Sequence, residues 1–133
     1  MLVDTGFLVA FGRGSDPLHE SADAFLRGYQ GPLVSVAPVI VETCFFLNPQ
    51  SKVRLLDWVR SGAITVTDVG VDAYPDIARI ILRYANRDID FADAALVWLA
   101  DRIGVRSILT VDQKDFAVYR AAGRRRFDVV DWM

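Results

Sequence analysis

Four acidic residues stand at positions where a carboxylate is unusual for a purely structural role. Asp4 closes a short apolar segment at the N-terminus, and Asp112 closes a second apolar segment near the C-terminus. Glu42 lies inside the apolar run Val39–Leu47, and Asp93 is surrounded by alanine, phenylalanine and leucine. Burying a carboxylate costs several kcal/mol unless another group offsets its charge. These acids therefore indicate a site that holds a cation.

The types of residue available restrict which cation this is. If the four carboxylates converge, their repulsion raises their pKa values or requires a positive charge among them. The chain has one histidine and one cysteine, and neither is close in sequence to the acids at the strand ends. Hard oxygen ligands without His or Cys select Mg²⁺ or Mn²⁺ rather than zinc.

Each acid also has a structural interpretation. Asp4 precedes Thr-Gly and fits a turn, and Asp112 fits the N-cap of a following helical turn. Asp90 stands three residues before Asp93 at a predicted helix start, which is a capping pattern that the helix dipole favours. Whether Asp90 is a ligand or a cap therefore stays open. Glu42 is the hardest to explain structurally, because no basic residue lies within one helical turn of it.

The surrounding sequence predicts an α/β fold. Short apolar segments alternate with segments of helical periodicity. Strands are expected at Met1–Asp4, Leu33–Val36, Ala63–Val69, Ser107–Val111 and Phe127–Val130, and helices at 17–28, 38–47, 51–62, 72–86 and 90–104. This order favours a largely parallel sheet covered on both sides, with functional groups beyond the carboxyl ends of the strands.

Composition sets the remaining bounds. With 133 residues, 53% of them hydrophobic, the chain is expected to form one domain and to fold without a metal or disulfide. The single cysteine, Cys44, fits a reducing cytoplasm. No segment has the roughly 20 apolar residues of a membrane span, so no membrane association is expected. A net charge of −2 gives no reason to expect tight non-specific nucleic-acid binding, although local basic patches can still contact RNA.

Four segments, in this order, resemble the motifs of a PIN domain. They are Val3-Asp4-Thr5-Gly6, Val41-Glu42, Asp90–Ala94 and Leu109–Phe116. The resemblance covers the whole chain and is specifically to the toxin subunit of VapBC type II toxin–antitoxin systems. It implies a three-layer α/β/α fold around a short, mostly parallel sheet, in a single domain over residues 1–133.

The resemblance also implies an activity, a metal site and partners. The activity is that of a metal-dependent endoribonuclease that hydrolyses RNA phosphodiester bonds with Mg²⁺ or Mn²⁺. The implied catalytic and metal-binding acids are Asp4, Glu42, Asp93 and Asp112, with Asp90 as an additional ligand and with Thr110 and Thr5 supporting them. The implied partners are RNA and a small antitoxin. Because the apolar fraction is high, we also expect surface for a homodimer.

Two groups of arginines are candidates for contacts with RNA phosphates. Arg79, Arg83 and Arg87 recur every four residues along one predicted helix face, and Arg124–Arg126 form a second cluster. For Arg79 and Arg83 a solvated helix face is the simpler interpretation. Arg87 is the nearest in sequence to Asp90 and is the preferred RNA-binding residue.

Other protein classes also place aspartates at strand ends. Haloacid-dehalogenase-like phosphatases have two aspartates two positions apart after the first strand, whereas Asp4 is followed by Thr5 and Gly6. Receiver domains have adjacent acids early in the chain, and that pair is absent. A non-catalytic PIN-like module that binds RNA or a protein remains the alternative, and metal-dependent cleavage by the purified protein would separate it from the enzyme.

Overall fold

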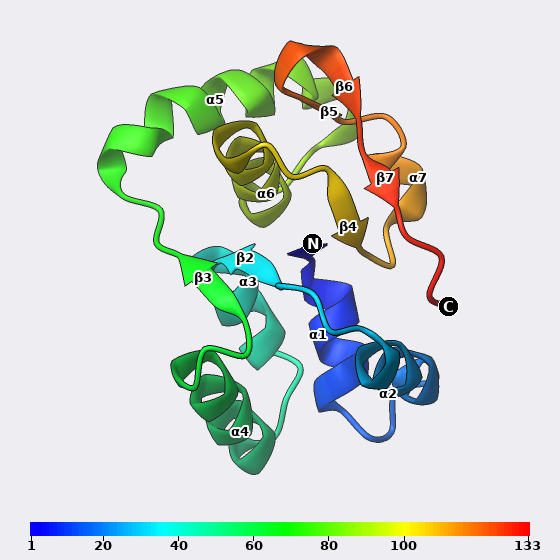
Figure 1. The fold of residues 1–133 in the computed structure, drawn as a ribbon. Coiled ribbons are helices and arrows are strands. Elements are labelled where there is room, and N and C mark those ends of the chain that lie inside the picture. The colour runs from blue at the N-terminus through cyan, green and yellow to red at the C-terminus, as the bar shows by residue number, and fades with distance from the viewer.

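A five-stranded parallel sheet forms the centre of the protein in the computed structural model, which describes residues 1–133 (Figure 1). The strand order is β3-β2-β1-β4-β7. The strands are β1 (Leu2–Val3), β2 (Val34–Val36), β3 (Thr65–Thr67), β4 (Ser107–Leu109) and β7 (Asp128–Val129). Every pairing in this sheet is parallel, with Leu2 opposite both Val34 and Ile108. The predicted parallel sheet is confirmed.

Helices cover both faces of the sheet, as the α/β/α prediction requires. In Figure 1, α5 and α6 lie above the strands, and α1, α2 and α4 lie below them. The α-helices are α1 (Thr5–Gly12), α2 (His19–Gly28), α3 (Ala37–Cys44), α4 (Pro49–Arg60), α5 (Tyr74–Arg83), α6 (Phe91–Ile103) and α7 (Gln113–Phe116). Three short 3₁₀ helices, η1 (Val71–Ala73), η2 (Ala85–Arg87) and η3 (Ala122–Arg124), complete the main fold. None of the helices is long and apolar enough to cross a membrane.

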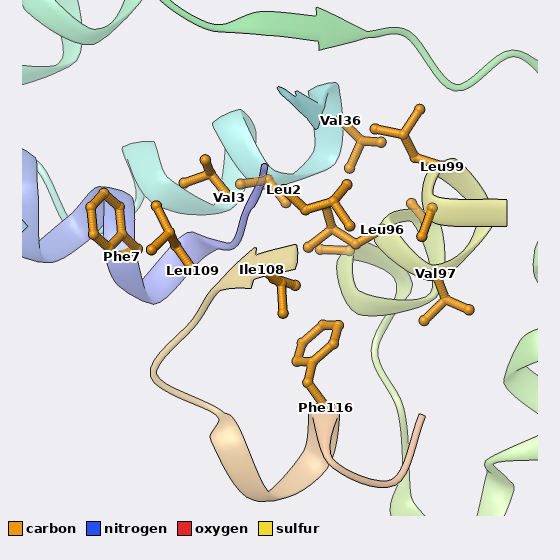
Figure 2. Packing of buried hydrophobic residues seen from close by; sticks show 14 of the residues in the cluster. Leu2, Val3, Phe7, Val36, Leu96, Val97, Leu99, Ile108, Leu109 and Phe116 are labelled. Carbon is orange, nitrogen blue, oxygen red and sulfur yellow. The ribbon is translucent and has the colours of Figure 1, made fainter. Parts of the chain in front are cut away.

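The core is continuous from the central strands into α6. Figure 2 shows Ile108 of β4 and Phe116 of α7 pointing toward the side chains of α6, including Leu96 and Val97. Nine consecutive residues of α6, from Ala92 to Ala100, are buried. Such a helix has no polar face to offer to solvent. It is therefore fixed firmly between the sheet and its neighbours, and its N-terminal residues are fixed with it.

The structure differs from the sequence expectations in three places. The apolar stretch after Gly6 is helix α1, whose residues Phe7–Ala10 are all buried, so it shows no amphipathic period. The helix predicted over 72–86 is divided into η1, α5 and η2. A two-stranded antiparallel sheet, β5 (Arg120–Ala121) with β6 (Arg125–Arg126), was not predicted, because its residues lack apolar alternation.

Candidate active site

Asp4 and Asp112 follow the two strands that flank the point where the strand order reverses. The chain runs from β1 outward to β2 and β3, and it returns to the other side of β1 with β4. In open parallel sheets, ligands bind beyond the carboxyl ends of the strands at such a switch point. Asp4 comes directly after β1, and its backbone N–H donates to Leu109 of β4 (3.0 Å). The structure therefore places both sequence-predicted aspartates at the expected end of the sheet.

Asp93 reaches the same site from the N-terminus of α6. It lies in the first turn of this helix, and its side chain is buried at 8% exposure. Asp90 is the N-cap of the helix, and its Oδ1 accepts a hydrogen bond from the backbone N–H of Asp93 (2.8 Å). The capping interpretation of Asp90 is thus realised in the structure. Its charge also raises the pKa of Asp93, so Asp90 belongs to the electrostatics of the site.

Glu42 comes from the second turn of α3, the helix that follows β2. It is half-buried rather than enclosed in the core, although Val39, Ile40 and Thr43 beside it are buried. Partial burial and the charges of Asp90 and Asp112 raise its pKa. Glu42 therefore extends the group of acids toward solvent.

Burial is the largest cause of the pKa shifts in the site. It raises the pKa of Asp4 to about 7, although hydrogen bonds from Thr110 and Thr5 act in the opposite direction. Burial, followed by the charges of Asp4, Asp90, Asp112 and Glu42, raises the pKa of Asp93 to about 9. Burial and the charges of Asp115 and Asp90 raise the pKa of Asp112. Asp4 and Asp93 therefore favour either a proton or a nearby cation at neutral pH, and a cation would likewise stabilise the charged forms of Glu42 and Asp112.

Thr110 connects the two strand-end aspartates. It is fully buried just beyond β4, and its hydroxyl donates to Asp4 Oδ2 (2.7 Å). The hydroxyl oxygen of Thr110 also accepts a hydrogen bond from the backbone N–H of Asp112 (2.9 Å). The indole of Trp132 donates to the Thr110 carbonyl (3.1 Å), so the C-terminal segment also fixes this strand end. Thr110 thus sets the orientation of Asp4 and the backbone position of Asp112.

Thr5 is the one residue with a buried side-chain polar atom that lacks a hydrogen-bond partner. Its backbone N–H donates to Asp4 Oδ1 (2.7 Å), but its Oγ1 is unpaired. A buried donor or acceptor without a partner costs about 1–3 kcal/mol. Thr5 lines the same pocket as Glu42 and Asp112. The cost would be relieved by a ligand or its water shell in that pocket.

The donor set fits a divalent cation in its chemistry. Oxygen ligands and an unpaired hydroxyl are what Mg²⁺ and its retained water molecules require. No three His, Cys, Asp or Glu side chains are close enough together to enclose an ion directly. Binding would therefore need either rotation of the exposed Asp112 and the half-buried Glu42 or water molecules between ligand and ion.

Two pockets open on either side of Glu42. One, of about 500 Å³, is lined by Thr5, Arg13, Glu42 and Asp112 among others. The other, of about 750 Å³, is lined by Glu42 and Asp90 and by exposed apolar side chains of Val41, Tyr74 and Phe91. Glu42 thus lines both pockets, whereas Asp112 and Asp90 each line one of them.

The structure also identifies residues near the site that the sequence did not. Arg13 lines the pocket of Glu42 and Asp112, just beyond the helix that was not predicted. The pKa of Tyr119 is raised by burial and by the charges of Asp93, Asp115 and Asp90, which places this tyrosine beside the acids. No spacing rule could have identified either, because both depend on tertiary packing.

Arg87, the preferred RNA-binding residue, is held in an ion pair. Its Nη1 donates to Asp115 Oδ1 at 2.8 Å, and about a third of its side chain is exposed. This pair is partly exposed and is worth at most about 1 kcal/mol. Arg87 is therefore near the site, and a phosphate would compete with Asp115 for it.

Comparison with known proteins gives a consistent result. The PIN domain family model matches residues 1–122. Ribonuclease VapC26 from Mycobacterium tuberculosis is 31% identical over 135 aligned positions, which cover 98% of this chain and 99% of the relative. The crystal structure of M. tuberculosis VapC20, described as a sarcin-ricin loop cleaving toxin, has a similar fold. Its TM-score is 0.77 at 22% identity, over 86% of this chain and 92% of that chain. The order of the acidic motifs, the parallel sheet and these matches agree, and the chain belongs to the PIN domain family.

Proposed function

We propose that this protein is an endoribonuclease that hydrolyses RNA phosphodiester bonds with Mg²⁺ or Mn²⁺. The observation that carries the proposal is the convergence of charge on Asp93. Asp4 and Asp112 come from strand ends and Asp90 from the start of α6. The charges of all three raise the pKa of Asp93, and the charge of Glu42 raises it further. The relative named as a ribonuclease, VapC26, supports the same activity.

In this proposal Asp4, Glu42, Asp93 and Asp112 hold the ion, and Asp90 contributes charge while it caps α6. When bound, the ion polarises the scissile phosphate and lowers the pKa of a water molecule for attack in line with the leaving oxygen. The protein's own contribution is to orient the carboxylates. Thr110 and Thr5 hold Asp4 by hydrogen bonds to its two oxygens.

A bound divalent ion would also allow an RNA phosphate to come close to the acids themselves. A cluster of carboxylates repels phosphate, and a divalent ion reverses the local sign of the charge. Arg87 and Arg13 then lie where they can contact phosphates that flank the cleavage site. We expect each of them to affect KM more than kcat, because neither is one of the acids that hold the ion in this proposal.

Cleavage by the purified protein tests this proposal against a non-catalytic RNA-binding module. A labelled RNA is incubated with Mg²⁺, Mn²⁺ or chelator, and products are separated by size. Internal cleavage with either metal, lost in chelator and in Asp4→Asn and Asp112→Asn, supports the enzyme. Binding of RNA without cleavage by the wild-type protein would refute it.

The proposal extends to partners and location. As the toxin of a type II toxin–antitoxin pair, the single domain of residues 1–133 would act in the cytoplasm and bind a small antitoxin. A basic side chain of the antitoxin could enter the acidic pocket in place of the metal, because the same carboxylates favour any cation. Co-purification with the product of a neighbouring reading frame tests this part.

A homodimer is also proposed, because large apolar side chains are exposed on adjoining elements. Val41 of α3 and Phe45, the C-cap of this helix, stand four residues apart at 57% and 75% exposure. Tyr74 and Phe91, also exposed, pack edge to face with each other. Val41, Tyr74 and Phe91 line one pocket, so they form a continuous apolar surface. Phe45→Glu should convert a dimer to a monomer in sedimentation experiments, whereas Leu82→Glu, at the equally exposed Leu82 of α5, serves as control.

A further inference from the structure

A hairpin rich in arginine lies near the C-terminus of α6, whereas the candidate active site lies at the N-terminus of this helix. The hairpin comprises residues Arg120–Arg126, in which β5 and β6 pair antiparallel. Arg120 is directly opposite Arg126 across the two strands, and Arg124 and Arg125 stand next to them. We call this segment the arginine hairpin. Its position above α6, near the end of α5, is visible in Figure 1.

The arginines of the hairpin differ in whether their side chains are bound within the protein. Arg120 is structural, because its guanidinium donates to the carbonyls of Ala117, Val118 and Tyr119 (2.8–3.0 Å). The side chains of Arg124–Arg126 are exposed and form no hydrogen bond or ion pair within the protein. These three guanidinium groups are therefore free to bind an external anion.

This arrangement costs stability in the free protein. Like charges directly opposite one another on paired strands are destabilising, and Arg120 and Arg126 form such a pair. Arg124 has a positive φ of 60°, a conformation that a non-glycine residue rarely adopts. A face that only needed solvation would carry mixed charges. The unbalanced positive charge of the hairpin is explained if an anion neutralises it.

A small pocket adjoins the free arginines. It has a volume of about 300 Å³ and is lined by Gly104, Arg106, Gly123 and Arg125 among others. Arg106 also donates to the carbonyl of Arg126 (3.1 Å), so the pocket is attached to the hairpin. The acids adjoining this pocket are Asp101, which follows the lining residue Ala100 on α6, and Asp128, two residues after Arg126 on β7. They do not balance the charges of Arg106 and Arg124–Arg126.

The fold fixes the distance between the hairpin and the acids. The acids lie at the N-terminus of α6, and the pocket residue Gly104 caps its C-terminus. A helix of 13 residues is about 20 Å long at 1.5 Å per residue. A single-stranded fragment of only a few nucleotides in the acidic site would not reach the hairpin, whereas a longer, folded RNA would span both.

We propose that the arginine hairpin is a second RNA-binding surface, which contacts the phosphate backbone of a folded substrate about 20 Å from the cleavage site. The inference rests on the proposed function for the identity of its partner. Phosphate contacts of this kind carry no sequence information but fix the position and orientation of the RNA. The hairpin would thus favour folded over unstructured RNA without touching the scissile bond.

The test compares two triple variants with the same change in charge. Arg124→Gln/Arg125→Gln/Arg126→Gln removes the free arginines, and Lys52→Gln/Arg54→Gln/Arg60→Gln removes three basic residues from α4 on the other side of the sheet. Binding of a fluorescently labelled RNA stem–loop is measured by anisotropy in chelator, between about 50 and 200 mM salt. Urea unfolding verifies that both variants are folded.

The hairpin variant should bind the stem–loop about tenfold or more weakly at low salt. Its slope of log K against log salt should fall by about 2–3, as expected for three lost phosphate contacts. The α4 variant should retain the wild-type slope. With metal, the hairpin variant should cleave a short single-stranded RNA at the wild-type rate and the stem–loop with a raised KM. Equal slopes in the two variants would overturn the proposal. A hairpin variant that binds RNA like the wild-type protein but binds a protein partner more weakly would also overturn it. Failure of the wild-type protein to cleave either RNA would instead contradict the proposed function.

Discussion

Asp93→Asn is the substitution whose effects on stability and activity should diverge most. In the metal-free protein the pKa of Asp93 is raised to about 9, so the folded state holds a proton at pH 7 that the unfolded state has lost. Because the usual pKa of an aspartate is 3.8, holding this proton at pH 7 destabilises the folded state by about 4 kcal/mol, at 1.36 kcal/mol for each pH unit. Movement of side chains and entry of water reduce this cost, so we expect Asn to raise the free energy of unfolding by about 1–3 kcal/mol.

The substitution leaves the helix cap intact, because Asp90 accepts from the backbone N–H of residue 93. Urea unfolding in chelator at pH 7 measures stability, and cleavage of RNA with Mn²⁺ measures activity. We expect activity to fall by about 100-fold or more, since even partners that only orient metal ligands contribute 10–100-fold. Asp57→Asn, at an exposed position of α4, removes one charge elsewhere and should change neither measurement. An Asp93→Asn protein that is less stable and fully active would refute the catalytic assignment.

Three further outcomes follow from the geometry. Thr110→Val keeps the shape of the buried side chain but removes the donor to Asp4, so we expect a loss of about 1–3 kcal/mol in urea unfolding and weaker Mn²⁺ binding by calorimetry. Gly6→Ala would place its methyl group against the side chain of Val111, so the thermal midpoint and kcat should both fall; retention of both would show that this turn tolerates a side chain. Without metal, unfolding experiments should show stability decreasing as pH rises from about 4 to about 9, because Asp4 and Asp93 bind more protons in the folded state. The Asp93→Asn protein should show a smaller decrease.

The parts of the fold that were predictable have strong local signals. Helix α6 was predicted almost to the residue, because Asp90 caps it and Gly104, with a φ of 70°, ends it. The strand-end positions of Asp4 and Asp112 followed from short apolar runs that stop at an acid. Helix α1 gave no such signal. Its buried residues face neighbours on all sides, and only tertiary packing reveals it as a helix.

The candidate site was predictable as a set of acids but not as a set of contacts. Sequence spacing indicated that Asp90 is either a cap or a ligand, and the hydrogen bond to Asp93 shows the cap. Spacing could not show that Arg87 is paired with Asp115, because this contact joins residues 28 positions apart. The unpaired hydroxyl of Thr5 is likewise a property of packing, since a threonine in a turn normally finds water or a carbonyl.

The balance of energies around Asp4 and Asp93 favours the proposed metal-binding role of these residues over a purely structural one. Both stand at helix N-termini, where the dipole favours an anion by about 0.3–1 kcal/mol. Burial nevertheless raises their pKa values to about 7 and about 9, so it outweighs the dipoles and the hydrogen bonds from Thr110 and Thr5. Arg87 is paired with Asp115 instead of with either of them. Asparagine would preserve the packing at both positions without the electrostatic cost, so the carboxylates are best explained by a cation that the protein does not itself supply.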